Sequence, residues 1–239
     1  MKVCSRLWGT QFTRSDEMRQ FNVILAGVVD HAIVAVEMKR IQKLRINDEI
    51  PDTLILVEHP EVVTIGPKAR KDGVEVPQRF ATSPIDRGGG ITWHGPGQMV
   101  AYPIFLWDLD GEKNVAAVIN LLEEWIINTL QPLGIIGGRD ERMQGIWKDG
   151  YKFSSVGLNF LKWVSRHGLT INYNTPDGRV EGLAGCGLTS GTTTSLSALG
   201  EQGLTREILE AMLISTAQTS LNRTVAKISC QSSNPPWPN

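Results

Sequence analysis

The sequence predicts an α+β fold, a single domain in which a mixed β-sheet is flanked by helices. Patterns typical of amphipathic helices occur near the start, the centre and the end of the chain, while short β-branched runs fill the middle. Regular strand–helix–strand alternation and internal repeats, which would favour a doubly wound parallel sheet, are both absent. The 239 residues are enough for one large core. We assign residues 1–231 to this domain and expect residues 232–239, which include three prolines, to form a flexible tail.

The predicted helices follow from the spacing of apolar residues. Between residues 17 and 45 apolar residues recur mostly every three or four positions, which predicts one long amphipathic helix. Asn114 can cap a second helix, which ends at Pro132 because proline cannot continue a helix. A third apolar stripe predicts a final helix over residues 206–221.

The predicted strands are short β-branched and apolar runs bounded by turn residues. They comprise residues 53–57, residues 62–65, residues 99–105 and three strands within residues 144–175. Residues 66–84 are charged and poor in apolar side chains, so we expect them to form loops at a functional surface.

Composition excludes several classes of protein. The net charge of -1 argues against nucleic acid as the main ligand, because binding to phosphates needs an excess of Lys and Arg. No stretch approaches the roughly 18 apolar residues of a membrane-spanning helix. Three cysteines without a Cys-x-x-Cys pair predict neither a disulfide framework nor a thiolate zinc site, and favour a reducing, cytoplasmic location. The four histidines lack ligand spacing such as His-x-x-x-His, so no metal site is expected.

Residues 87–98 contain the densest motif, Arg-Gly-Gly-Gly-Ile-Thr-Trp-His-Gly-Pro-Gly-Gln. Its five glycines would let the backbone approach a ligand and present N–H groups to it. The motif lacks the Lys-Ser/Thr of a phosphate-binding loop, so glycine content alone leaves a binding loop and a structural turn equally open.

Cys186 lies between two glycines, where an accessible thiol could attack an acyl carbon while nearby amides stabilise an oxyanion. Lys152 opens a predicted strand and would favour the thiolate if it lay beside Cys186. Taken alone, these two residues are better explained as a buried cysteine and a solvated lysine. His31 falls inside the first predicted helix and is expected to be structural. His59, His94 and His167 border loops where a cleft could form.

Five segments together resemble the lipoyl(octanoyl) transferase family in their order and spacing, over about residues 20–215. They are Leu-Val-Glu-His-Pro at 56–60, the glycine-rich motif at 87–98, Lys-Phe-Ser-Ser-Val-Gly at 152–157, His-Gly-Leu at 167–169 and Gly-Cys-Gly-Leu at 185–188. The family usually has proline at the position of Gly185 and isoleucine at that of Phe153.

The resemblance implies a catalytic domain like those of biotin and lipoate protein ligases. It implies transfer of an octanoyl or lipoyl group from acyl carrier protein to a lysine of a lipoyl domain of a 2-oxoacid dehydrogenase, or of glycine-cleavage H protein. This is the first step of endogenous protein lipoylation and needs neither ATP nor a cofactor. Cys186 would attack the donor thioester, and Lys152 would lower the pKa of the thiol and handle protons.

The resemblance also implies residues that bind the acyl group. They are Arg87, Gly88, Gly89, Gly90, Ile91, Thr92, Trp93, His94, Ser155, Val156, Gly157, Gly168, Leu169, Thr170, Tyr102 and His59. Two other classes stay open: an ATP-dependent lipoate or biotin ligase, and a silent acyl-binding relative. Because acyl carrier proteins are acidic, we also expect the cluster of Lys68, Arg70 and Lys71 to help dock the donor.

Overall fold

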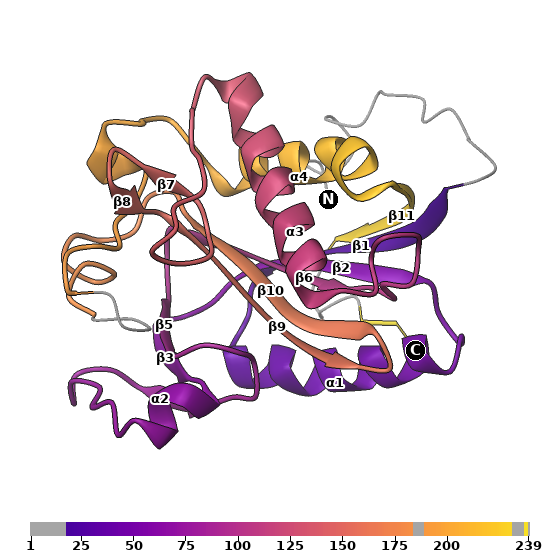
Figure 1. The fold of residues 1–239 in the computed structure, drawn as a ribbon, viewed down its shortest axis with the longest axis horizontal. Helices are drawn as coiled ribbons and strands as arrows, with labels where there is room; N and C mark the ends of the chain where they lie inside the picture. The colour runs from indigo at the N-terminus through magenta and orange to yellow at the C-terminus, as the bar shows by residue number, and fades with distance from the viewer. Residues whose placement is uncertain (1–17, 184–188, 231–236, 239) are drawn as a thin grey trace.

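A six-stranded mixed sheet forms the centre of the protein (Figure 1). The computed structural model describes residues 18–183, 189–230 and 237–238. In spatial order the strands are β11 (Arg223–Cys230), β1 (Arg19–Val28), β2 (Asp52–Glu58), β6 (Gln98–Ile104), β10 (Val164–Asn172) and β9 (Ser154–Leu161). β1 runs parallel to β11 and β2, whereas β2, β6, β10 and β9 pair antiparallel in turn. The predicted α+β class with a mixed sheet is confirmed.

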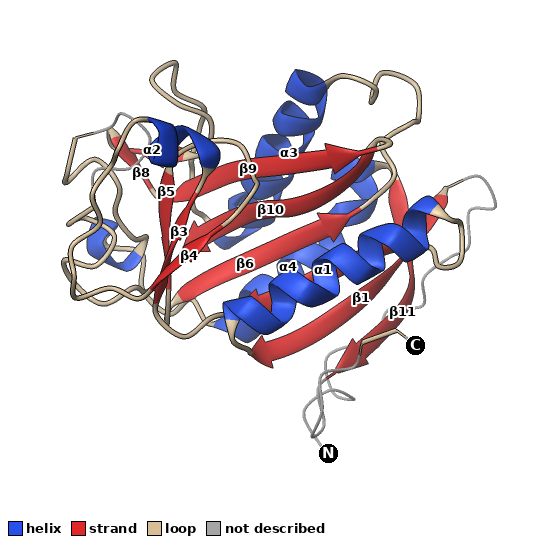
Figure 2. Cartoon of the chain, turned by 90° about the horizontal axis from the view of Figure 1, so that it is seen from below, coloured by secondary structure: helices blue, strands red, loops and turns tan. Residues whose placement is uncertain are grey.

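Helices cover both faces of this sheet (Figures 1 and 2). On one face lies α1 (His31–Ile46), while α3 (Val115–Leu130) and α4 (Arg206–Leu221) pack together on the other. Strands β2, β6 and β10 are buried along their whole lengths because both faces are covered. Two separate apolar clusters result, one under α1 and a larger one under α3 and α4. No helix in the described ranges is long and apolar enough to cross a membrane.

Two smaller sheets lie beside the large one. The first sheet consists of β4 (Thr82–Pro84), β3 (Val62–Ile65) and β5 (Ile91–His94). The second sheet has two strands, β7 (Trp147–Lys148) and β8 (Tyr151–Lys152). The remaining elements are the short helices α2 (Pro67–Lys71), η1 (Gln131–Leu133) and η2 (Ser197–Leu199). Both small sheets therefore carry segments in which the sequence motifs had placed candidate residues.

The predicted helix over residues 17–45 is wrong in its first half, where the chain forms β1 instead. This strand pairs with both β2 and β11, so its backbone hydrogen bonds come from partners distant in sequence. Apolar spacing alone cannot separate such a buried strand from a helix. The helix begins only at His31, after Asp30 in the N-cap position, and it connects two parallel strands.

Other predicted elements agree with the structure to within a few residues. The strands at β2, β3 and β6 and the helices α3 and α4 are confirmed. Asn114 caps α3 as expected, because its side chain accepts hydrogen bonds from the N–H groups of Ala116 and Ala117. The edge strand β11 was not expected. Cys230 at its end takes part in a disulfide bond, although the sequence had predicted no disulfide framework.

A buried ionic network joins β11 to the rest of the large sheet. Arg223 has no exposed surface, and its guanidinium pairs with Asp52 at 3.0 Å and with Glu112 at 2.7 Å. Asp52 also accepts a hydrogen bond from Arg45 at 2.7 Å. A buried pair of this kind leaves uncompensated charges when one partner is removed.

We predict that Arg223→Ala lowers the free energy of unfolding by roughly 3–5 kcal/mol, because Asp52 and Glu112 would stay buried without their cation. Urea unfolding followed by circular dichroism measures this loss. The matched control is Lys227→Ala on the same strand, where the side chain is exposed and the expected change is within about 0.5 kcal/mol. Equal losses for the two variants would contradict a role for the network.

Candidate active site

A cavity of about 350 Å³ lies where the small sheet β4–β3–β5 meets β9, β10 and the first turns of α3. Of the residues expected to bind the acyl group or act in catalysis, those lining it are Arg87, Gly88, Gly89, Ile91, Thr92, Trp93, His94, Tyr102, Lys152, Ser155, Val156, Gly157, Gly168, Leu169 and Thr170. The structure therefore brings together segments that are up to about eighty positions apart in sequence. Cys186 and its neighbour Gly185 lie outside the described residues.

Two expected binding residues do not line the cavity. His59 is completely buried behind Tyr102, with which it forms a hydrogen bond of 2.9 Å. Gly90 is buried, and its carbonyl oxygen accepts a hydrogen bond of 3.0 Å from the N–H group of Gly66. A side chain at Gly66 would clash with this segment, since its Cβ would lie 2.4 Å from the carbonyl oxygen of Gly89. Both residues thus support the cavity wall from behind.

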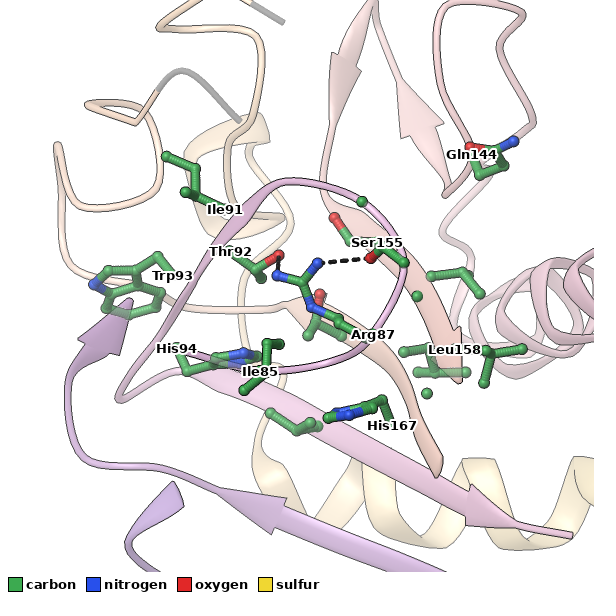
Figure 3. A pocket seen from close by; sticks show the side chains of 18 of the residues that line it. Ile85, Arg87, Ile91, Thr92, Trp93, His94, Gln144, Ser155, Leu158 and His167 are labelled. Carbon is green, nitrogen blue, oxygen red and sulfur yellow. Dashed lines mark hydrogen bonds between the residues drawn. The ribbon is translucent and has the colours of Figure 1, made fainter. Parts of the chain in front are cut away.

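Arg87 brings a positive charge into the cavity (Figure 3). Its guanidinium donates hydrogen bonds to the hydroxyls of Thr92 at 2.6 Å and Thr64 at 3.1 Å. Figure 3 shows the side chain directed toward Thr92 and Ser155. Gly157 makes room for it, because a Cβ there would lie 3.1 Å from Cδ of Arg87. These hydrogen bonds hold the guanidinium at the wall of the cavity.

Gln98 fixes the turn between β5 and β6. Its Nε2 donates to the carbonyl of Trp93 at 2.9 Å and to Oδ1 of Asn172 at 2.8 Å. Its Oε1 therefore accepts from Nδ1 of His94 at 2.7 Å, which assigns that proton to Nδ1. Gly97 within the turn has φ of +79°, and a Cβ there would lie 1.9 Å from the carbonyl oxygen of Asn174. The turn glycine is thus required both by conformation and by space.

Three histidine rings form a buried cluster at one end of the cavity. The ring centroids of His31, His59 and His94 lie 5.3 to 5.8 Å apart. Burial lowers the pKa of His59 to about 4, that of His94 well below its usual value, and that of His31 in the same direction. All three are therefore neutral near pH 7. Within the described chain no group of His, Cys, Asp and Glu is arranged to hold a metal ion.

His31 corrects one expectation, because it lines the cavity instead of serving only the packing of a helix. It is the first residue of α1, and its side chain is 2% exposed. Its Nδ1 is buried and forms no hydrogen bond with the described residues. A polar atom in this state can form a hydrogen bond with a ligand.

Lys152 reaches the cavity from β8 and is only 5% exposed. Its backbone is held on both sides, since its N–H donates to Thr192 and its carbonyl accepts from Thr194, each at 2.9 Å. Gly145 makes room for the side chain, because a Cβ there would lie 2.6 Å from Cε of Lys152. The N–H of Gly145 donates to the buried carboxylate of Glu123 on α3 at 2.7 Å, which fixes this glycine.

Asp86 and His167 connect the glycine-rich segment to β10. Nε2 of His167 donates to Asp86 at 2.9 Å, and Arg166 pairs with the same carboxylate at 2.6 Å. Burial lowers the pKa of His167 to about 4 despite the nearby carboxylate, so this contact is a hydrogen bond from a neutral ring and not an ion pair at pH 7. His167 has φ of +61°, a left-handed conformation that is uncommon for any residue except glycine.

Several lining residues were not among those that the resemblance implied for binding the acyl group. They are Ile85, Val100, Val115, Ile119, Met143, Gln144, Leu158, Val180, Leu183, Thr193, Asn172, Gln98 and Lys68, together with His31 and His167. Most are apolar side chains, whose local sequence gives no signal of a ligand. Gln98 and His167 lie inside recognised motifs and could have been found there. The combined lining is largely apolar, with one guanidinium group and two ammonium groups, which suits an acyl chain with a polar head.

We predict that the stability of the protein falls as the pH is lowered from about 6.5 to 4, because buried histidines whose pKa is lowered must be protonated. A shift from 6.5 to about 4 in His59 corresponds to roughly 3 kcal/mol. His59→Gln should flatten this dependence while keeping a donor for Val29 and an acceptor for Tyr102. Urea titrations at a series of pH values measure it, and parallel curves for the two proteins would contradict the assignment.

Comparison with known proteins gives a consistent result. Residues 34–218 match the family model described as the lipoyl protein ligase A/B catalytic domain. An octanoyltransferase of Solibacter usitatus is 35% identical over 191 residues, which cover 77% of this chain and 86% of the relative. An octanoyltransferase of Rickettsia prowazekii is 35% identical over 184 residues, covering 74% and 88% of the two chains.

Solved structures show the same fold at low sequence identity. A lipoate-protein ligase A bound with ATP superposes with a TM-score of 0.64 and 12% identity, covering 90% of each chain. A bipartite lipoate protein ligase of Thermoplasma acidophilum gives a TM-score of 0.64 and 13% identity, covering 90% of this chain and 88% of the other. The fold expected from the resemblance is thus confirmed, and the chain belongs to the lipoyl protein ligase A/B catalytic-domain family.

Proposed function

We propose that the protein is an octanoyltransferase that carries its acyl group on Cys186. The donor is octanoyl-acyl carrier protein, and the acceptor is a lysine of a lipoyl domain or of glycine-cleavage H protein. The observation that carries the proposal is the buried amine of Lys152 in the wall of an acyl-sized, largely apolar cavity. Leu183 lines the same cavity and precedes Cys186 by three residues. This short separation supports the proposal that Cys186 acts together with Lys152.

In the first half of the proposed reaction the Cys186 thiolate attacks the carbonyl carbon of the donor thioester. The bond from that carbon to the donor sulfur breaks, and the carrier thiol leaves after taking a proton from Lys152. An ammonium at Lys152 would favour the thiolate before the attack, because a nearby positive charge lowers the pKa of a thiol. One thioester is exchanged for another, so no ATP is consumed.

In the second half the neutral amine of the acceptor lysine attacks the acyl-Cys186 carbonyl. An amide bond forms, the carbon–sulfur bond breaks, and a proton passes from the amine through Lys152 to the Cys186 sulfur. An amide is more stable than a thioester, which drives transfer forward. The reaction leaves the protein in its starting state.

The acyl chain is proposed to lie among the apolar residues of the cavity. A volume of about 350 Å³ is near the lower limit of roughly 300–1,000 Å³ for small-molecule sites. Arg87 would hydrogen-bond the carbonyl, while Val156, Leu158 and Leu169 would contact methylene groups. We propose a cytoplasmic location, because the reaction needs Cys186 as a free thiol and a reducing compartment maintains it. In that compartment Cys230 would also be reduced, and its disulfide bond would be absent.

We predict that incubation with octanoyl-acyl carrier protein, without ATP, adds the mass of one octanoyl group to the wild type. The adduct should be labile to hydroxylamine, since thioesters are, and absent in Cys186→Ser. Intact-protein mass spectrometry measures both. Acylation of an acceptor that needs ATP and free octanoate would instead identify an ATP-dependent ligase, and no acylation under either condition would indicate a silent acyl-binding relative.

We predict that Lys152→Met slows formation of the acyl-enzyme by roughly 10²–10⁴-fold near pH 7, because the thiol loses its cation and its proton donor. Quenched-flow mass spectrometry measures the rate. The rate of the variant should rise steeply toward the ordinary thiol pKa of about 8.5. Lys148→Met is the matched control on the paired strand β7, and it should leave the rate unchanged. A flat pH profile in Lys152→Met would exclude the role in thiolate formation.

A further inference from the structure

The outward surface of α1 has an unusual composition. Its exposed residues begin with Ala32, Ile33 and Val36 and continue with Lys39 and Lys43. Ile33 is 51% exposed and Val36 is 65% exposed, although the outward face of a surface helix is normally polar. The apolar half of this stripe directly follows His31, which lines the acyl cavity. An apolar patch therefore lies on the outward surface of α1, near the end of the helix where His31 reaches the cavity.

A groove of about 220 Å³ adjoins this stripe, between α1, α2, β4 and β10. Its lining includes the three cations Lys39, Arg70 and Arg166 and one carboxylate, Asp86. Ile85 and His167 line both this groove and the acyl cavity, so the two hollows share a wall. The carboxylate is already paired with Arg166, which leaves the groove with an excess of positive charge.

The positive charge continues onto α2. Lys68 and Lys71 are exposed there, and Lys68 also lines the acyl cavity. Arg70 is held more tightly, because its guanidinium donates to the carbonyls of Ile65 and Ile85. Arg70 therefore also stabilises the loop that follows β4, so we leave it out of the basic surface formed by Lys68 and Lys71. Figures 1 and 2 show α1 and α2 on the same side of the large sheet.

The nearby acids offset only part of this charge. Glu37 on α1 is already paired with Arg40 at 2.8 Å. Asp72 lies at the C-terminal end of α2, where it follows the three basic residues of that helix. The protein as a whole has a net charge of -1, so the basic cluster is a local feature and not a consequence of overall composition.

We propose that Ile33, Val36, Lys39, Lys68 and Lys71 form a carrier-docking face for the acidic protein that delivers the acyl group. The proposal rests on the octanoyltransferase function and adds the surface that the donor uses. The cations steer an acidic partner and raise its association rate, while the apolar residues of α1 slow its dissociation. A donor bound here would present its acyl chain at the rim of the cavity beside Lys68.

The test is a single-turnover measurement of acyl-enzyme formation with octanoyl-acyl carrier protein below saturation, over a range of salt concentrations. The double variant Lys39→Glu with Lys71→Glu should lower kcat/KM at least tenfold and reduce its dependence on salt. Val36→Ser should lower kcat/KM several-fold without changing the salt dependence. Lys227→Glu is the control, because this exposed lysine lies on β11 at the opposite edge of the sheet (Figure 2).

Octanoyl-pantetheine, a donor without the carrier protein, separates this proposal from the proposed function. All variants should be acylated by it at the wild-type rate. An undiminished rate of the double variant with the carrier-bound donor would overturn the docking face while leaving the octanoyltransferase function intact. Loss only of transfer from preformed acyl-enzyme to the acceptor would overturn the donor assignment. A wild type that neither donor acylates would overturn the proposed function itself.

Discussion

The cavity depends above all on one buried amide, the side chain of Gln98. It contacts β5 through Trp93 and His94 and β10 through Asn172, and it belongs to β6 itself. It is 1% exposed, and each of its polar atoms has a partner. Leaving one such group unpaired costs about 1–3 kcal/mol, so the three strands are held in one arrangement. The small sheet and the large sheet can enclose the cavity only while these hydrogen bonds of Gln98 are intact.

Around Gln98, glycines determine how closely neighbouring strands and side chains approach each other. A Cβ at Gly168 would lie 2.1 Å from the carbonyl oxygen of Ala101, so β10 and β6 pair closely at this point only without a side chain. Gly157 and Gly145 give space to Arg87 and Lys152 in the same way. Arg87 and Lys152 therefore have room in the cavity because the positions opposite them carry no side chain.

Elements with local signals could be predicted from the sequence. Helix α3 is set by the Asn114 cap, and α4 begins after Thr205, whose hydroxyl accepts from the N–H of Ile208. β1 could not be predicted, because the apolar spacing of a buried strand of this kind does not differ clearly from that of a helix. The wrong helix start also led to a wrong expectation for one residue of the site, His31. With the helix expected to begin near residue 17, His31 fell inside it, whereas its actual place at the start of α1 directs it to the cavity.

At His167 the strain of a left-handed backbone opposes the benefit of a hydrogen bond. A non-glycine residue in this conformation costs of the order of 1 kcal/mol or more, and glycine would remove that cost. Glycine would also remove the link to Asp86, which joins β10 to the residue preceding Arg87. The loss of this hydrogen bond and the relief of backbone strain have opposite effects on stability and similar size, so glycine at this position would change stability little while loosening the segment that holds Arg87.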